Sequence, residues 1–278
     1  MAYLYRNKAF TLIELLVVIA IIALLMAIIM PGLSRAKNQA QATVCLANLN
    51  GLTKSWMLYA QENNDRTVGV TVGNTGDPDY CWVDAPQDSL GNLCLTTALG
   101  TADDEIRGIE KGLLFDYTSD PELYHCPSDR RYMDRPELYP SATGDGGYRT
   151  YSLAAGAGPT RASEVTWNGF DPYLRLSRIP GPGDKYVFVE EADGRGINAN
   201  SWVIKPQNPT AWVDPIAVSH MERSTLGFAD GHGEKHRWVD ESTIGMAERQ
   251  DTNMTLPAGE SGEDLAYMIR NYPYLRLH

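Results

Sequence analysis

The hydrophobic and polar positions divide the chain into three stretches, and the first is almost wholly apolar. From Leu12 to Met30 it reads LIELLVVIAIIALLMAIIM, in which Glu14 is the single charged residue. About 20 residues at a rise of about 1.5 Å cross a hydrocarbon core of about 30 Å. We therefore predict a membrane-spanning helix over residues 10–32. An ionised side chain at such a depth costs several kcal/mol unless it is paired, so Glu14 requires a partner and is a functional candidate.

The second stretch, residues 33–64, has the pattern of an amphipathic helix. Pro31 and Gly32 precede it, and we expect a kink or local melting there because proline removes a helical hydrogen bond. A helix stop at the membrane surface is the alternative. Beyond them one face is apolar and the other polar. The apolar positions are Cys45, Leu49, Leu52, Trp56 and Tyr59, and the polar ones are Gln39, Thr43, Asn50 and Lys54. The pattern predicts one long helix whose second half packs on a globular head; a separate helix after Pro31 is the other interpretation.

The third stretch, residues 65–278, alternates short β-like runs with turn-forming residues. The predicted strands are TVGVTV, YCWV, YRTYSLA, KYVFVEEA, SWVI, TLGFA and EKHRWV. Helices do not alternate with these strands in the manner of a parallel sheet, which favours an antiparallel sheet and an α+β class. Two short helices are expected, one within 103–120 and one within GEDLAYMIRNY near the C-terminus.

The balance of charges restricts the orientation and the partners. Lys and Arg total 24 and Asp and Glu total 35, a formal net charge of -11. Arg6 and Lys8 precede the span without any acidic neighbour, which places the N-terminus in the cytoplasm and the head outside. The acidic remainder argues against nucleic acid as a partner.

The stretch KAFTLIELLVVIAIIALL resembles the leader and first helical turns of type IV pilins and type II secretion pseudopilins. The resemblance implies that a prepilin peptidase removes residues 1–9 by cleaving between Ala9 and Phe10 and then N-methylates Phe10. The usual family residue before the cut is Gly, where this chain has Ala9. Cleavage frees an ammonium on Phe10, one helical turn from Glu14, and in the family a neighbouring subunit supplies that ammonium during filament assembly.

Two other interpretations of the N-terminal segment compete with this one. One is an ordinary secretory signal peptide cut after Ala36. The apolar run of this chain, however, is longer than the apolar core of a usual signal peptide. The other is a simple membrane anchor, which leaves Glu14 unexplained.

A second resemblance lies in SHMERSTLGFADGH, where nine residues separate His220 from Asp230-Gly231. This is similar to the H-X9-DG element of large pilin-like proteins of planctomycete and verrucomicrobial type. It implies a pilin-like fold, with a long N-terminal helix packed on an antiparallel head. Asp-Gly between two strands is a strong hairpin signal because the turn requires positive φ. We expect His220 to contact Asp230 or the nearby backbone across this hairpin.

Four cysteines follow the span, and four cysteines allow three pairings. Cys81 and Cys94 bracket one self-contained loop, while Cys45 lies on the apolar stripe of the helix. We predict the disulfides Cys45–Cys126 and Cys81–Cys94, and the resemblance implies the same first pair. No CxxC pair or His-rich tract indicates zinc, so no metal ligands are predicted.

The remaining polar clusters give weaker indications. Asp77, Asp79, Asp84 and Asp88 lie close together without EF-hand spacing, so calcium is considered but assigned to no residue. Glu190 and Glu191 are neighbours on a predicted strand and point to opposite faces, which makes an acid–base pair poor. No cofactor and no catalytic residue is predicted, and the protein is not expected to be an enzyme.

The patterns together predict a structural subunit of a type II secretion pseudopilus or a type IV pilus-like filament. Its expected partners are copies of itself, the prepilin peptidase and methyltransferase, and an inner-membrane assembly platform. We expect a single-pass inner-membrane protein with a periplasmic head that is assembled into a periplasmic or surface filament. The alternative is a membrane-tethered domain that binds extracellular glycans or peptides and does not polymerise.

We predict that replacing Ala9 with a large residue, as in Ala9→Phe, blocks leader removal. The peptidase site has to accept a small side chain immediately before Phe10. The variant should keep all nine leader residues and remain monomeric in the membrane, as measured by N-terminal sequencing and shearing of filaments. Cleavage found after Ala36 would instead identify an ordinary signal peptide.

Overall fold

The computed structural model describes residues 10–71, 80–94, 101–130, 147–159, 170–192 and 201–275. The chain divides into two compact units, one ending at Ala40 and the other beginning at Gln41. The first unit is the apolar part of helix α1 with the start of its polar part. The second, called the head below, contains the rest of α1 and all of the other elements.

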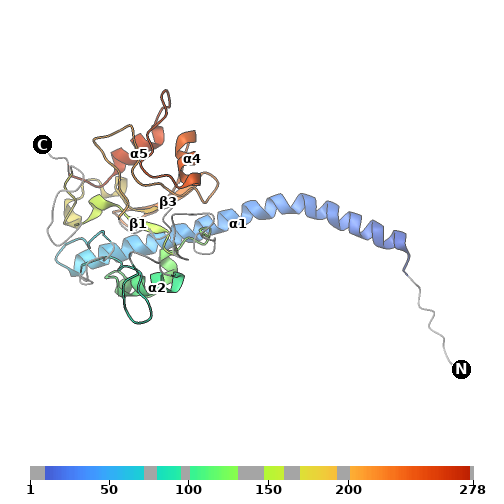
Figure 1. Cartoon of the computed structure of the whole chain (residues 1–278), viewed down its shortest axis with the longest axis horizontal. Coiled ribbons are helices and arrows are strands. Elements are labelled where there is room, and N and C mark those ends of the chain that lie inside the picture. The colour runs from blue at the N-terminus through green and yellow to red at the C-terminus, as the bar shows by residue number, and fades with distance from the viewer. Residues whose placement is uncertain are drawn as a thin grey trace. The chain divides into compact units, whose positions relative to one another are not determined.

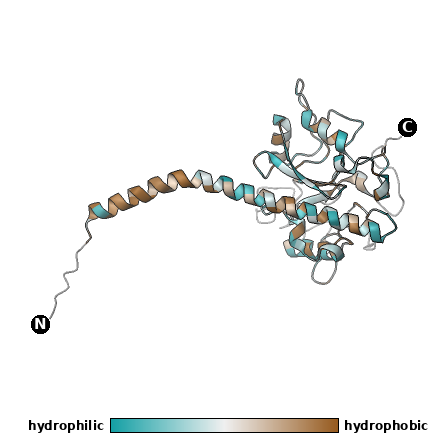
Figure 2. Cartoon of the chain, turned by 180° about the vertical axis from the view of Figure 1, so that it is seen from behind, coloured by the Kyte–Doolittle hydropathy of each residue, from teal (hydrophilic) through white to brown (hydrophobic). Residues whose placement is uncertain are grey.

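The predicted long helix is confirmed. Helix α1 runs from Leu12 to Glu62 without interruption. Figure 2 shows its first half brown with apolar residues and its second half mixed. It ends in the turn-forming stretch ENND, where Asn64 and Asp65 have positive φ angles of 56° and 67°. Asn and Asp tolerate this left-handed conformation better than other residues with a side chain, so the sequence itself stops the helix there.

The core of the head is a four-stranded antiparallel sheet in the order β1-β2-β3-β4, which confirms the predicted α+β class. Figure 1 shows the sheet between α1 on one side and α4 and α5 on the other. The strands are β1 (Tyr151–Leu153), β2 (Tyr186–Glu190), β3 (Arg223–Phe228) and β4 (Gly233–Arg237). The remaining elements are α2 (Ala102–Lys111), α3 (Phe115–Thr118), η1 (Pro121–Tyr124), η2 (Ala155–Ala157), η3 (Leu176–Arg178), η4 (Pro182–Asp184), α4 (Glu241–Arg249) and α5 (Glu263–Asn271).

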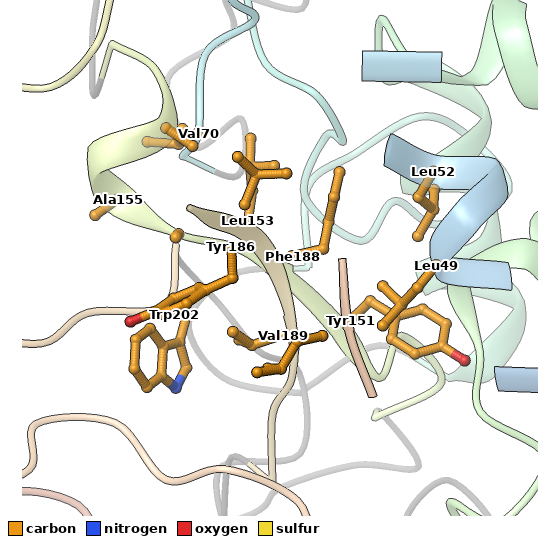
Figure 3. Packing of buried hydrophobic residues seen from close by; sticks show 14 of the residues in the cluster. Leu49, Leu52, Val70, Tyr151, Leu153, Ala155, Tyr186, Phe188, Val189 and Trp202 are labelled. Carbon is orange, nitrogen blue, oxygen red and sulfur yellow. The ribbon is translucent and has the colours of Figure 1, made fainter. Parts of the chain in front are cut away.

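The predicted apolar stripe of α1 is buried against this sheet. Cys45, Leu49, Leu52 and Trp56 are fully buried, and Tyr59 is half-buried at the end of the row. Figure 3 shows Leu49 and Leu52 facing Tyr151 and Phe188 of the sheet. Burying a side chain of this size contributes about 1.5–3 kcal/mol, so the stripe is a major part of the stability of the head.

Both predicted short helices are present, the segment 103–120 also contains α3, and one further helix was not predicted. Thr101 and Asp104 form a capping box that starts α2, and α5 occupies the expected C-terminal segment. The unpredicted helix is α4, whose buried residues Thr243, Met246 and Ala247 follow helical spacing within a short polar stretch.

Three of the predicted strands form no ladder, and this corrects the sequence analysis. TVGVTV and YCWV meet only at the isolated bridge Gly69↔Cys81, and SWVI only at Ala154↔Trp202. In the first case the backbone bonds are divided among several partners, because Gly69 bonds Tyr80 and Trp82 while Val70 bonds Pro159. Residues 72–79 lie outside the described ranges. The apolar pattern of these runs reflects burial rather than membership of a sheet.

The close contact between α1 and the sheet depends on glycine. A Cβ atom on Gly227, near the end of β3, would lie 2.7 Å from Thr53 Cγ2 of the helix and 3.4 Å from Phe188 Cβ. Helix and strand therefore approach at a distance that leaves no room for a methyl group.

We predict that Gly227→Ala lowers the free energy of unfolding by about 1–3 kcal/mol, because the added methyl group pushes α1 away from β3. Gly245→Ala in α4 is the matched control, since its Cβ would meet only the mobile end of Arg249. Replacing a glycine inside a helix should leave stability unchanged or raise it by about 0.5–1 kcal/mol. Denaturant unfolding in detergent measures both variants; equal stability of the two would contradict the proposed packing.

Candidate functional site

The apolar half of α1 is the first candidate site. From Leu12 to Met30 its large apolar side chains are exposed in the isolated chain. Among the described residues, α1 is the one helix long and apolar enough to cross a membrane. A helix that is hydrophobic on all sides is stable only when lipid or other protein surrounds it.

Glu14 has partners within its own chain, which the sequence analysis did not identify. Its Oε2 atom accepts hydrogen bonds from the Thr11 backbone N–H at 2.9 Å and from the Thr11 hydroxyl group at 2.7 Å. The Thr11 Oγ1 atom accepts in turn from the Glu14 backbone N–H at 3.3 Å. This is a reciprocal capping box, and the Thr-x-x-Glu spacing was its signal. The cap hydrogen-bonds the carboxylate but brings it no positive charge.

The other predicted features of this segment have separate outcomes. Helix α1 continues through Pro31 and Gly32, so the helix stop and the local melting are absent from the structure, and the kink stays a prediction. Ala9 and the rest of the predicted leader lie outside the described residues. The pairing of Glu14 with an ammonium on Phe10 is not tested by a single chain that still carries its leader.

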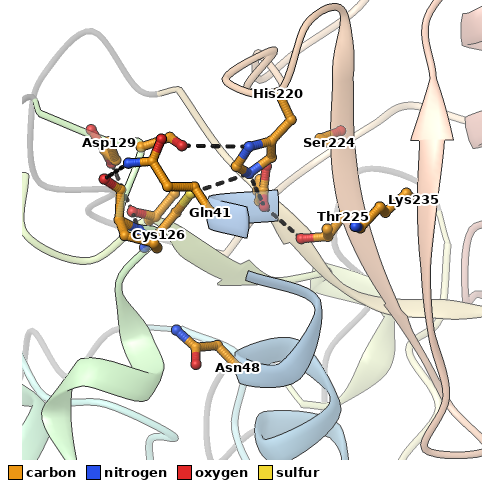
Figure 4. A network of polar contacts seen from close by, with 12 residues as sticks. Gln41, Asn48, Cys126, Asp129, His220, Ser224, Thr225 and Lys235 are labelled. Carbon is orange, nitrogen blue, oxygen red and sulfur yellow. Dashed lines mark hydrogen bonds and ion pairs between the residues drawn. The ribbon is translucent and has the colours of Figure 1, made fainter. Parts of the chain in front are cut away.

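The second candidate site is a buried group of four side chains in the head. Cys45, Cys126, Glu190 and His220 each offer one donor atom, and these atoms all lie within 4.8 Å of one another. Cys45 comes from α1, Cys126 follows η1, Glu190 ends β2 and His220 precedes β3. All four are at most 3% exposed. Figure 4 shows Cys126 and His220 facing each other across the space beside α1. We call these residues the four-residue cluster.

Two polar side chains of α1 fix the segment that carries Cys126. Gln41 donates from Nε2 to the Pro127 carbonyl at 2.8 Å. Asn48 donates from Nδ2 to the carbonyls of Glu122 and His125, at 3.2 and 3.0 Å. Residues at spacings of three and four share one helical face, so both lie on the same face as Cys45. The helix therefore holds Cys126 next to Cys45.

His220 is positioned by a tight turn before β3. Met221 and Glu222 have φ angles of 55° and 58°, and the His220 backbone N–H donates to the Arg223 carbonyl at 3.2 Å. The His220 Nε2 atom lies 3.3 Å from Cys126 Sγ and 3.4 Å from Glu190 Oε1. Its Nδ1 atom lies 3.4 Å from Ser128 Oγ. Both ring nitrogens therefore have neighbours, and the ring is fixed in orientation.

Burial and close charges shift the pKa values in this cluster. Burial has the largest influence on His220 and lowers its pKa, but the contacts with Cys126 and Glu190 outweigh it and raise the pKa to about 10. Burial, reinforced by the neighbouring Cys45 and Glu190, raises the pKa of the Cys126 thiol far above its usual range.

None of the four cysteines, all of which lie in described ranges, forms a disulfide in the structure. Cys45 and Cys126 come together as the predicted pair requires. Cys94 donates its thiol to the Asn92 carbonyl at 3.8 Å, and Cys81 Sγ lies 4.0 Å from Thr71 Oγ1. The structure places the first pair close together, and both disulfide bonds stay predictions.

The expected contact between His220 and Asp230 is wrong. The hairpin itself is confirmed, with Gly231 at a φ of 94° in the turn between β3 and β4. However, Asp230 accepts hydrogen bonds from the backbone N–H and ring of His232, at the opposite end of β3 from His220. A strand of six residues at about 3.3 Å each keeps the two motif residues about 20 Å apart. His220, at one end of the motif, belongs to the four-residue cluster, and Gly231, at the other end, forms the turn.

The acidic residues considered for calcium are in part described. Asp84 accepts from the Ala85 backbone N–H and from Gln87 Nε2, and Asp88 accepts from the Leu90 and Asn92 backbone N–H groups. These bonds stabilise local turns, which is the ordinary role of Asp at such positions. Asp77 and Asp79 lie outside the described residues.

Comparisons with known proteins agree with the character of the N-terminal segment. A family described as the prokaryotic N-terminal methylation motif matches residues 4–30. The type IV wide pilus major component PilA4 of Thermus thermophilus is 50% identical to the chain over 95 residues. That alignment covers 32% of this chain and 72% of the relative. No solved structure matches the chain.

We predict that Asn48→Ala destabilises the head by about 1–2 kcal/mol, because two carbonyl groups lose their donor in a half-buried contact. Gln41→Ala on the same helical face removes one exposed hydrogen bond and should cost less than about 0.5 kcal/mol. Thermal unfolding of the two variants in detergent measures the difference. A larger effect for Gln41→Ala would show that Asn48 does not hold the segment that carries Cys126.

Proposed function

The chain belongs to the type IV pilin family, and from this premise we propose that it polymerises through its N-terminal helix into an extracellular pilus. The family makes it a structural subunit of a pilus-like filament rather than an enzyme. The observation that supports polymerisation is a fully exposed apolar half-helix that carries a single carboxylate. The wide-pilus relative favours a surface pilus over a secretion pseudopilus.

The apolar half of α1 supplies contact area but little specificity. In a membrane, lipid tails are as apolar as leucine, so helix association needs close packing or polar contacts to fix its geometry. Glu14 is the single charged group between Leu12 and Met30. An ammonium on Phe10 of a neighbouring subunit is a fitting partner, because it supplies the positive charge that Thr11 does not. This pair would set the axial register between subunits.

The same proposal specifies the processing and the partners. A prepilin peptidase removes residues 1–9 between Ala9 and Phe10 and methylates Phe10. An inner-membrane assembly platform extracts the subunit from the bilayer. Arg6 and Lys8 hold the N-terminus in the cytoplasm before processing, and the head lies on the opposite side.

The structure disfavours the alternative of a tethered glycan-binding domain. Such domains present aromatic rings on an exposed surface. Within the described ranges, every tryptophan is at most 1% exposed: Trp56, Trp82, Trp202, Trp212 and Trp238. These rings form the core, and Trp82, for example, packs edge-on against Phe188 with ring centroids 5.5 Å apart.

We predict that Glu14→Gln and Glu14→Val both remain in the membrane but fail to enter filaments. The Gln side chain can still accept the two hydrogen bonds from Thr11, so this variant keeps the helix cap and loses only the charge. Leu16→Val is the matched control and should assemble normally. Immunoblotting of sheared filaments against membrane fractions measures incorporation. Normal assembly of Glu14→Gln would show that the charge is not required.

The choice between a pilus and a pseudopilus is tested by shearing intact cells. A surface pilus is recovered in the sheared fraction, and its subunits should begin with N-methyl-Phe10 by mass spectrometry. Filaments that stay within the cell envelope under the same shear would support a secretion pseudopilus instead. Unprocessed monomers that retain Met1 would contradict polymerisation.

A further inference from the structure

The four-residue cluster contains more donor groups than either a core or a disulfide requires. Two cysteines, a histidine and a glutamate from four separate elements converge with all donor atoms within 4.8 Å. Buried histidine and glutamate side chains are costly to place in a core. We propose that Cys45, Cys126, Glu190 and His220 bind one zinc ion in the head.

The chemistry of the donors fits zinc. Thiolate sulfur and imidazole nitrogen are the usual ligands of structural zinc, and a carboxylate oxygen is an accepted fourth ligand. Calcium and magnesium prefer sites made of oxygen atoms and would be bound poorly by two thiolates. The set of two sulfurs, one nitrogen and one oxygen therefore selects a borderline-soft cation with tetrahedral coordination.

Two of the distances between these donor atoms match those expected for tetrahedral zinc. Zinc bonds of about 2.0–2.3 Å place a sulfur and a nitrogen ligand about 3.5 Å apart and a nitrogen and an oxygen ligand about 3.4 Å apart. The Cys126 Sγ to His220 Nε2 distance is 3.3 Å, and the His220 Nε2 to Glu190 Oε1 distance is 3.4 Å. Only small side-chain movements would bring all four donors to one ion.

The surrounding contacts orient these donors as they do in known metal sites. A metal-bound histidine usually offers its other ring nitrogen to an oxygen, and here Ser128 Oγ lies 3.4 Å from His220 Nδ1. Thr225 donates its hydroxyl hydrogen to Glu190 Oε1 and so orients the carboxylate. Ser128 and Thr225 each contact a proposed zinc ligand and would not bind the ion themselves.

An unsatisfied buried atom gives independent support. Glu190 is fully buried, and its Oε2 atom has no hydrogen-bond partner. A carboxylate group with one oxygen unpaired in a core is costly, and a cation bound to that carboxylate would offset the cost.

Burial makes this a closed structural site rather than a reactive one. Cys126 is fully buried and His220 is 3% exposed, so no substrate reaches a thiolate there. A depression of about 430 Å³ lies beside the cluster, lined in part by Ser128, Glu191 and Ser219. Ser128 contacts His220 and Ser219 precedes it, so this depression adjoins the four-residue cluster.

A zinc ion here would cross-link the head at its most important contact. It would join the packed half of α1 to the segment after η1, to the end of β2 and to the turn before β3. Binding to the folded state alone stabilises a protein in proportion to the logarithm of the ion concentration over its dissociation constant. The site stands independently of the proposed polymerisation, because all of its ligands lie in the head.

The predicted Cys45–Cys126 disulfide is the competing use of the same two sulfur atoms. A disulfide needs neither His220 nor Glu190. A zinc site uses all four side chains and explains why they converge. The two states differ in metal content and in thiol chemistry, so one experiment separates them.

The test uses the full-length protein, purified from membranes in detergent with zinc-free buffers and a thiol reductant. Metal-free protein is titrated with zinc chloride, and bound zinc is counted by inductively coupled plasma mass spectrometry. We expect one zinc per chain and an upward shift of the thermal unfolding midpoint on zinc addition. Cobalt chloride in place of zinc should give thiolate-to-cobalt charge-transfer absorption and the intense visible bands of a tetrahedral ion.

Matched variants locate the ion. Glu190→Gln and Cys126→Ser, which preserve side-chain size, should each lower zinc affinity at least tenfold. Ser128→Ala should lower it about tenfold while keeping the thiolate-to-cobalt absorption, since Ser128 only orients His220. The double variant Cys81→Ser/Cys94→Ser should bind zinc like the parent chain. Circular dichroism of each metal-free variant checks that the head is folded.

Three results would overturn the proposal. One is a metal-free parent chain that binds no zinc. Another is zinc binding unchanged in Cys126→Ser and Glu190→Gln but lost in Cys81→Ser/Cys94→Ser. The third is a Cys45–Cys126 peptide, found by non-reducing mapping of protein whose thiols were blocked in intact native cells. Loss of filament assembly in Glu14→Gln has no bearing on these outcomes, so the two proposals fail separately.

Discussion

The contact between α1 and the sheet is the constraint on which the rest of the head depends. Leu49, Leu52 and Trp56 fill the space above β2 and β3, and Gly227 lets the helix approach. This contact fixes the position of the helix along its axis and its rotation about that axis. It therefore also fixes the direction of the Cys45 side chain. The polar contacts of Gln41 and Asn48 then draw the segment after η1 to the same face. A metal site built from four elements is possible only because one hydrophobic seam aligns them.

One continuous helix serves two environments, and its composition changes accordingly. Up to Met30 it is apolar on every side, which suits lipid or the interior of a filament. From Gln41 onward it is apolar on one face only, which suits packing on a sheet. Pro31 and Gly32 lie between the two regimes without ending the helix. Pro31 lacks the backbone N–H of one helical hydrogen bond, and Gly32 has no side chain. Neither lipid nor the sheet stabilises the backbone at this point, so bending the helix costs the least free energy there.

The features that follow a simple periodicity were predictable, and those made of distant residues were not. The stripe of α1, the Asp-Gly hairpin and α5 all have local signals. The runs YCWV and SWVI share the apolar composition of strands but sit in irregular buried segments, which periodicity does not distinguish from a sheet. The four-residue cluster has no local signal at all, because Cys45, Cys126 and His220 come from separate elements. Even the motif that contains His220 suggested the wrong partner, since Asp230 lies within the same strand–turn unit and Glu190 does not.

The charge of Glu14 is only partly satisfied within its own chain. In the single chain it closes a capping box with Thr11, so the carboxylate accepts two hydrogen bonds before any neighbour is present. These bonds lower the cost of holding the charge near apolar surroundings but leave it uncompensated. In the filament that we propose, a neighbouring ammonium would supply the missing charge, and its attraction would be strongest where water is excluded. The cap would stabilise the carboxylate of the monomer in the membrane, and the uncompensated charge would favour the proposed filament over the monomer.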